Sequence, residues 1–168
     1  MSDATTPLAV LVLAAGQGTR MQSGLAKVLH PLGGRPMLHH VLAAAEALKP
    51  ERLVTVVGRD ADAVREAFAG RAQFVLQEQR QGTGHAVLQT ESALEGFSGD
   101  VLVLYGDTPL LTQSTVEQLI SQHHDAQATV TMLTTELENP HGYGRVMRQA
   151  NGQVLKIVEE KDATDEER

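Results

Sequence analysis

LAVLVL at residues 8–13 is an unbroken apolar run of strand length near the start of the chain. A run that is apolar at every position is typical of a strand buried on both faces, as in a parallel sheet covered by helices. The next seven residues, AAGQGTR at positions 14–20, are small or polar and include two glycines, and Met21 follows them. We therefore expect a buried strand that ends in a tight turn.

This turn has the chemistry of a phosphate site. Gly16 and Gly18 can adopt positive φ and let backbone N–H groups approach a ligand, and successive N–H groups in such a turn attract anions. Arg20 and Lys27 add two cations at the same end of the strand. The turn matches neither the Walker pattern nor the dinucleotide fingerprint, whose third glycine is replaced by Met21. A phosphate site is favoured, and a plain strand-exit turn is the alternative.

Apolar strands alternate with helical patterns along most of the chain. Strands are expected at Leu8–Leu13, Arg52–Val57, Ala72–Leu76 and Asp100–Leu104, and helices at Met37–Leu48, Ala61–Ala69 (capped by Asp60), Thr83–Leu94 and Ser114–His124. This alternation predicts an α/β fold with a Rossmann-like, mostly parallel sheet, right-handed crossovers and helices on both faces.

The last third of the chain predicts a strand and a hairpin. Ala128–Leu133 has the composition of a further strand. Gly144–Arg148 and Val154–Val158 flank Asn151-Gly152, which is a strong hairpin signal.

Composition excludes several classes of protein. The 168 residues include no cysteine, so disulfides and thiolate metal sites are impossible. The net charge is −7, and the last ten residues hold six acidic and two basic side chains, which argues against nucleic-acid binding. No apolar run approaches the ~20 residues of a membrane span, and the N-terminus lacks a signal-peptide pattern. We expect a cytoplasmic protein with no membrane or nucleic-acid partner.

Two further segments follow expected strands, where ligands of open α/β sheets bind. Gln77–Gly84 is polar, and glutamine amides can read the edge of a nucleobase; a hydrophilic loop with Thr83 as the helix cap is the simpler alternative. Asp107 follows the strand that ends at Leu104, and magnesium prefers one or two carboxylates plus substrate phosphates. Asp107 is therefore a candidate magnesium ligand opposite the glycine turn, and a turn before Pro109 is the alternative.

Four segments together resemble the sugar nucleotidyltransferases: residues 13–21 with Lys27, residues 77–83, residues 105–107 and residues 142–145. The added segments KVLH at 27–30, GTGHA at 82–86 and EKDAT at 160–164 resemble the bacterial bifunctional uridylyltransferases that make UDP-N-acetylglucosamine. The resemblance extends from Leu8 to the end of the chain and implies the nucleotide-diphospho-sugar transferase fold.

The resemblance implies a reaction. An ionised oxygen of N-acetylglucosamine 1-phosphate attacks the α-phosphorus of UTP with magnesium, giving UDP-N-acetylglucosamine and pyrophosphate for peptidoglycan and lipopolysaccharide precursors. The nucleophile is already an anion, so positioning and charge neutralisation matter more than a strong base.

The resemblance also implies site residues. The catalytic set is Arg20, Lys27 and Asp107, with Asp107 as the metal ligand. The implied nucleotide and sugar contacts are Leu13, Ala14, Ala15, Gly16, Lys27, Gln77, Gly82, Thr83, Tyr105, Gly106, Asp107, Gly144 and Glu159. Tyr105 has a packing role as its alternative, and Glu159 could belong to the acidic tail, with the register displaced by one to Glu160. Ala26 stands where the family usually has proline.

By the same resemblance, residues 1–168 are part of one pyrophosphorylase domain whose C-terminal part is missing, with no acetyltransferase β-helix. The trimer contacts of the family lie mainly in that β-helix, so a monomer or weak oligomer is expected. Two alternatives stay open: a catalytically silent nucleotide-binding module, and a nucleotidyltransferase of the same fold for another sugar phosphate or choline phosphate.

Overall fold

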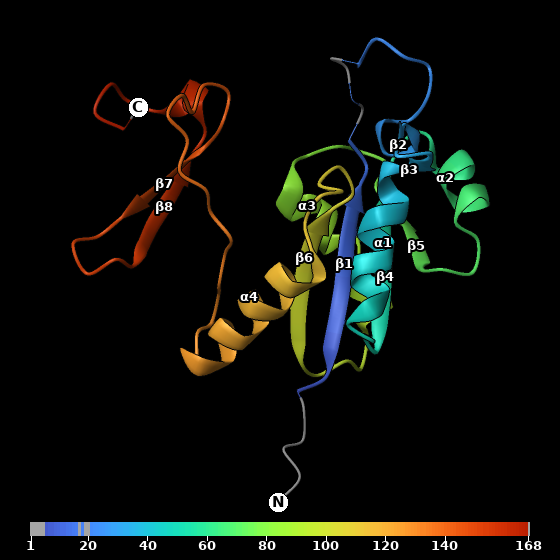
Figure 1. Cartoon of the computed structure of the whole chain (residues 1–168), viewed down its shortest axis with the longest axis horizontal. Coiled ribbons are helices and arrows are strands. Elements are labelled where there is room, and N and C mark those ends of the chain that lie inside the picture. The colour runs from blue at the N-terminus through green and yellow to red at the C-terminus, as the bar shows by residue number, and fades with distance from the viewer. Residues whose placement is uncertain (1–5, 17, 19–20, 168) are drawn as a thin grey trace, which may run out of the picture. The chain divides into compact units, whose positions relative to one another are not determined.

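The computed structural model describes residues 6–16, 18 and 21–167. The chain divides into two compact units, a larger one at Met1–Gln118 and a smaller one at Leu119–Arg168 (Figure 1). None of the described helices is long and apolar enough to cross a membrane.

A four-stranded parallel sheet forms the centre of the larger unit, with strand order β5-β4-β1-β6. The strands are β1 (Leu8–Ala14), β4 (Arg52–Val57), β5 (Gln73–Leu76) and β6 (Asp100–Tyr105). Leu11 of β1 is in register with Val54 of β4 on one side and with Val103 of β6 on the other. The predicted parallel sheet is confirmed, and β1 is one of its two central strands.

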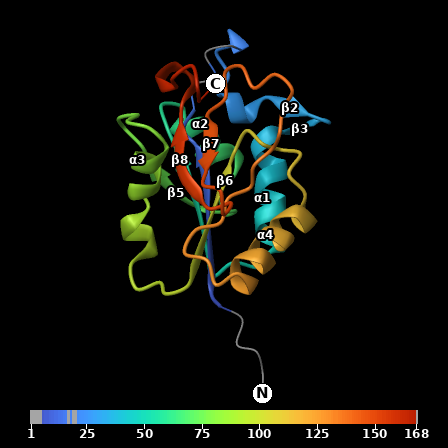
Figure 2. The ribbon, with the colours of Figure 1, turned by 90° about the vertical axis from the view of Figure 1, so that its left-hand side faces the viewer.

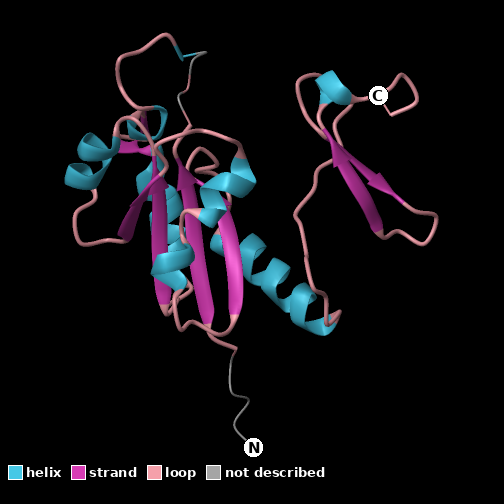
Figure 3. Ribbon diagram, turned by 180° about the vertical axis from the view of Figure 1, so that it is seen from behind, coloured by secondary structure: helices cyan, strands magenta, loops and turns pink. Residues whose placement is uncertain are grey.

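Helices cover both faces of this sheet, as the sequence predicts. The helices of the larger unit and the helix that leaves it are α1 (Met37–Ala47), α2 (Ala61–Ala67), α3 (Thr83–Leu88) and α4 (Gln113–Asp125), with short 3-10 turns η2 (Lys27–Leu29) and η3 (Glu91–Leu94). Seen along the sheet, α1 and α3 lie on opposite sides of it (Figure 2), and the view from behind shows α3 in front of the strands (Figure 3). A small hairpin of β2 (Pro31–Leu32) and β3 (Arg35–Pro36) precedes α1.

The core explains the apolar run at the start of the chain. Residues Ala9–Val12 of β1 are completely buried. On one face Leu11 and Val54 pack with Ala93 of η3, and α1 buries Leu38, Val41, Leu42 and Ala45. A strand that is covered on both faces favours apolar side chains at every position, because a buried amide or hydroxyl loses its hydrogen bonds to water on folding.

One predicted helix is broken in the structure. Thr83–Leu94 divides into α3 and η3 around Thr90. The Thr90 backbone N–H and hydroxyl both donate to the Val87 carbonyl, at 2.9 and 2.7 Å. A local threonine bond of this kind competes with the helical pattern and ends the first segment.

The predicted cap at Asp60 is wrong, and the alternative cap at Thr83 is not observed either. The Asp60 side chain does not cap α2; it stands at the N-cap position without a hydrogen bond to the helix, and the Ala61 N–H donates to the Gly58 carbonyl instead. The N-cap of α3 is Gly82 rather than Thr83, with φ of 102°. At this φ the glycine conformation, rather than a side-chain oxygen, sets the start of the helix.

The smaller unit contains the predicted hairpin but not the predicted strand. The antiparallel strands β7 (Arg145–Arg148) and β8 (Val154–Val158) are followed by the 3-10 turn η4 (Glu160–Asp162). Ala128–Leu133 is irregular, and its apolar Val130 and Leu133 are 74% and 56% exposed. A strand needs a neighbour for its backbone hydrogen bonds, and none of the described strands pairs with this segment.

Candidate active site at the strand ends

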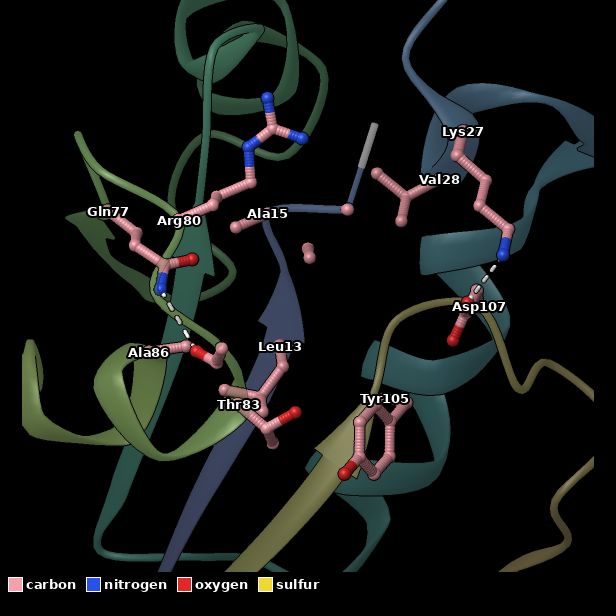
Figure 4. A pocket seen from close by; sticks show the side chains of 13 residues that line it. Leu13, Ala15, Lys27, Val28, Gln77, Arg80, Thr83, Ala86, Tyr105 and Asp107 are labelled. Carbon is pink, nitrogen blue, oxygen red and sulfur yellow. Dashed lines mark hydrogen bonds and ion pairs between the residues drawn. The ribbon is translucent and has the colours of Figure 1, made fainter. Parts of the chain in front are cut away.

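A cavity of about 240 Å³ opens in the larger unit where β1, β5 and β6 end (Figure 4). Its wall is formed by Leu13, Ala14, Ala15, Gly16, Lys27, Val28, Gln77, Arg80, Gly82, Thr83, Ala86, Tyr105 and Asp107. Ten of these residues were expected to contact substrate. The cavity therefore brings together three segments that are far apart in the sequence.

The register of the sheet places these segments side by side. Leu13 of β1 is opposite Tyr105, the last residue of β6. The Gly106 N–H donates to the Leu13 carbonyl at 2.9 Å. A Cβ on Gly106 would lie 3.2 Å from side-chain carbons of Ala14 and Val28. Gly106 therefore holds the two strand ends together behind the cavity and does not line it.

One side of the cavity carries an ion pair. Lys27 Nζ lies 2.6 Å from Asp107 Oδ2, and both side chains are about one-third exposed, at 34% and 35%. The turn after β1 packs directly on this lysine: Gly18 has φ of 59°, and a Cβ there would lie 2.7 Å from the Lys27 Cβ. Gly16 does not have positive φ. Lys27 and the acidic end of β6 thus face each other.

The other side of the cavity is formed by the loop between β5 and α3. Gln77 is buried, at 4% exposure, and its Nε2 donates to the Gly82 carbonyl at 3.3 Å and lies 3.0 Å from His85 Nδ1. In Figure 4 the side-chain oxygen of Gln77 points into the cavity, toward the side where Tyr105 lies. A fixed amide with a free acceptor is suited to reading the edge of a planar base.

Three residues of the wall were not predicted: Val28, Arg80 and Ala86. Val28 and Ala86 lie inside the segments KVLH and GTGHA, so those segments already contained a signal for them. Arg80 lies inside the loop that was expected to read a base through uncharged groups. The positive charge of Arg80 in this otherwise uncharged part of the loop could have identified it from the sequence as a candidate site residue.

Besides Gly106, three predicted residues are not part of this wall. Arg20 lies outside the described residues. Gly144 and Glu159 belong to the smaller unit, where a Cβ on Gly144 would lie 3.9 Å from Glu159 Oε2. These two residues are therefore close to each other.

The neighbour of Glu159 has a structural task instead. Glu160 accepts a hydrogen bond from the Gly142 N–H at 2.8 Å and lies 3.4 Å from Arg145 Nη2. The Gly142 amide, followed by His141 and Arg145, holds the pKa of Glu160 below its ordinary value. Glu160 fixes the GYG turn to η4, which leaves Glu159 as the exposed carboxylate of the pair.

The wall fits a metal ion that arrives with a nucleotide. No three His, Cys, Asp or Glu side chains in the described part of the chain form a group that could hold an ion alone. Asp107 supplies one carboxylate, and magnesium sites commonly combine one or two carboxylates with substrate phosphates.

Comparisons with known proteins agree with this geometry. Residues 10–165 match the MobA-like NTP transferase domain family. The bifunctional protein GlmU of Geobacter metallireducens is 53% identical over 163 residues, which are 96% of this chain and 34% of that protein. The GlmU of Halalkalibacterium halodurans is 52% identical over 158 residues, or 94% of this chain and 35% of that protein. The chain spans about a third of the length of the curated relatives it matches.

Solved structures show the same fold at low sequence identity. The crystal structure of Rv0371c from Mycobacterium tuberculosis H37Rv superposes with a TM-score of 0.62 at 24% identity, over 72% of this chain and 62% of that one; a further crystal structure of it is a complex with manganese. A nucleotidyl transferase from Methanothermobacter, Mth528, gives 0.58 at 22% identity, over 68% and 57%. Since the family match covers nearly the whole chain and the sheet carries its cavity at the strand ends, this chain belongs to the MobA-like NTP transferase family and is a nucleotidyltransferase domain.

Proposed function

We propose that the strand-end cavity binds UTP, and that this chain is part of a pyrophosphorylase domain that forms UDP-N-acetylglucosamine and pyrophosphate from UTP and N-acetylglucosamine 1-phosphate. One observation carries the proposal. A lysine–aspartate pair at 2.6 Å and a buried glutamine amide lie on different sides of a single cavity. Identity of 53% to a GlmU protein over 96% of this chain supports the choice of substrates.

The loop after β5 binds the base in this proposal. Uracil presents an N–H donor between two carbonyl acceptors. The free oxygen of Gln77 accepts from that N–H, and the Thr83 hydroxyl and the backbone at Gly82 are within the same wall. Because Gln77 is held by Gly82 and by His85, it does not need to reorganise when the base enters.

The turn after β1 and Lys27 bind the phosphates. The backbone of Leu13–Gly16 forms the floor under them, and by resemblance Arg20 adds a second cation. Lys27 is neutralised by Asp107 in the free protein. Asp107 would hold magnesium when the nucleotide is bound, and Lys27 then turns to a phosphate oxygen. The ion would add positive charge next to the negative charge of the phosphates.

The chemistry requires little else from the protein. The attacking phosphate oxygen is already ionised, so the side chains orient the two substrates and stabilise developing charge. Tyr105, Gly144 and Glu159 are the proposed sugar contacts. Tyr105 is 46% exposed at the cavity wall, so its ring can cover a sugar. These substrates would place the reaction in the bacterial cytoplasm, in the supply of peptidoglycan and lipopolysaccharide precursors.

Titration calorimetry tests the nucleotide part of the proposal. UTP with magnesium should give a saturable heat, CTP a much weaker one, and both heats should decrease with added salt. A chain that binds neither nucleotide would contradict the proposal. Pyrophosphate release from UTP and N-acetylglucosamine 1-phosphate, measured with a coupled assay, tests the reaction.

A silent nucleotide-binding module is the second candidate. One observation favours it: within the described residues, Asp107 is the single carboxylate of the cavity wall. Tight UTP binding without pyrophosphate release would support this candidate. Release with a sugar phosphate other than N-acetylglucosamine 1-phosphate, in a panel that includes choline phosphate, would support a related transferase.

A further inference from the structure

Arg80 is a charged residue of the cavity wall that the expected site did not include. Within the described part of the chain it makes no hydrogen bond and no ion pair, whereas Lys27 lies 2.6 Å from Asp107. The charges of Lys27 and Asp107 cancel. The positive charge that remains on the described wall is therefore that of Arg80.

The loop holds Arg80 at the edge of the cavity. Gln77 at the start of the loop is bonded to the carbonyl of Gly82 at its end, at 3.3 Å. The flanking side chains Gln79 and Gln81 are bonded to each other at 3.1 Å. Arg80 stands between them, and Figure 4 shows its guanidinium directed away from the Gln77 amide and from Tyr105. The residue that carries the charge is thus separated from the groups that face the base.

We propose that Arg80 binds the phosphate groups of the nucleotide, as a cation supplied by the base-recognition loop in addition to Lys27. A guanidinium presents paired N–H donors that match two phosphate oxygens, and such charge-assisted bonds are about twice as strong as neutral ones. A nucleoside triphosphate brings several negative charges into a wall that is otherwise neutral. This inference depends on the proposed nucleotide site.

The test compares ligands that differ only in their number of phosphates. Uridine, UMP, UDP and UTP are titrated, at fixed magnesium, into the wild type and into Arg80→Gln and Arg80→Lys. Arg80→Gln should leave uridine affinity unchanged and weaken UTP binding about tenfold or more, the scale of one charge-assisted hydrogen bond, with smaller losses for UDP and UMP. The salt dependence of UTP binding should also decrease. Arg80→Lys should restore part of the loss because it keeps the charge.

Arg52→Gln is the matched control. Arg52 is the first residue of β4, so it lies at the end of the sheet away from the cavity, and its guanidinium is 3.5 Å from Glu51. Arg52→Gln removes the same charge as Arg80→Gln, and it should not change the affinity for any of the four ligands by more than twofold.

Three outcomes would overturn the inference. Equal losses for uridine and UTP would mean that the guanidinium stacks on the base. No loss for UTP would mean that Arg80 has no contact with the ligand. If the wild type itself binds none of the four ligands, the proposed nucleotide site fails, and the role of Arg80 fails with it.

Discussion

Four consecutive residues of β1 in the larger unit, Ala9–Val12, are completely buried, whereas four of the five residues of β8 in the smaller unit are exposed. The exposed residues of β8 include Leu155 and Ile157, at 60% and 57%. Both strands are rich in apolar residues, so apolar composition alone does not distinguish them. The difference is the number of covered faces.

This difference in burial bears on how each strand is stabilised. A parallel sheet with a helix layer on each face buries side chains from both sides, while an isolated two-stranded hairpin is marginally stable in water. The larger unit therefore carries the core and the whole of the cavity. The smaller unit holds Gly144 directly before β7 and Glu159 directly after β8.

The largest expected effect comes from truncating a core side chain. Leu11→Ala should lower the free energy of unfolding by about 2–5 kcal/mol, because a buried leucine leaves a cavity behind. Ile157→Ala, on the exposed face of β8, should change it by less than about 0.5 kcal/mol. Urea unfolding followed by circular dichroism measures both. Similar losses for the two variants would mean that the hairpin is as deeply buried as the sheet.

The second effect separates function from stability within the larger unit. Asp107→Ala removes the proposed metal ligand, so magnesium should no longer strengthen UTP binding. Without magnesium the variant should bind UTP at least as tightly as the wild type, because Lys27 loses its partner at 2.6 Å. Stability should change by only about 1 kcal/mol or less, as for exposed ion pairs.

The control for Asp107→Ala is Asp62→Ala. Asp62 is an exposed carboxylate on α2, 4.0 Å from Arg65, and it does not line the cavity. Titrations of UTP with and without magnesium should not distinguish this control from the wild type. A full magnesium response in Asp107→Ala would remove Asp107 as the ligand.

The third effect is a pH dependence in the larger unit. Burial lowers the pKa of His39, and so do the guanidiniums of Arg71 and Arg35, which lie 2.9 and 2.7 Å from its two ring nitrogens. The folded state thus binds the proton less tightly than the unfolded state, whose histidine titrates near 6.5. Stability from this residue is complete above pH 6.5 and is lost as the pH decreases below that value through the lower folded pKa.

His39→Gln measures this contribution. The difference in melting temperature between wild type and variant should be constant above pH 7.5 and should shrink between pH 6.5 and 5. A difference that grows on acidification would mean that the folded protein prefers protonated His39.

The sequence predicts the covered sheet of the larger unit better than it predicts the exposed segments of the smaller unit. The apolar run of β1 and the alternation of strands and helices identified the sheet, because both faces of a covered strand leave an unbroken signal. Ala128–Leu133 has similar composition, but no local feature shows whether a neighbouring strand will satisfy its backbone. The break at Thr90 depends on one hydroxyl bond to Val87, which competes with a helical pattern that remains visible in the sequence.

The candidate site shows the same limit at the level of single residues. The segments that end strands were predicted, since parallel strands bring their carboxyl ends to one edge. The pairing of Lys27 with Asp107 and the free charge of Arg80 were not predicted. They depend on the directions of side chains that are far apart in the sequence: Asp107 is 80 residues and Arg80 is 53 residues after Lys27.

The smallest expected effect is a pH dependence in the smaller unit, at lower pH than that of His39. The Lys156 ammonium and then the backbone and hydroxyl of Thr164 hydrogen-bond to Glu167 and lower its pKa from 4.5 to about 2. Because the folded pKa is below the unfolded one, the stabilisation is complete above pH 4.5 and is lost as the pH decreases toward 2.

Titration of the Glu167 carboxyl by NMR should give the low pKa directly, and Lys156→Ala should raise that pKa, because the substitution removes its largest cause. The same titration separates the two units: acidification through pH 6.5 acts on the larger unit through His39, and only acidification below 4.5 reaches this contact. A Glu167 carboxyl that titrates at 4.5 in the wild type would mean that the turn at residues 164–167 is not held to Lys156 of β8 in solution.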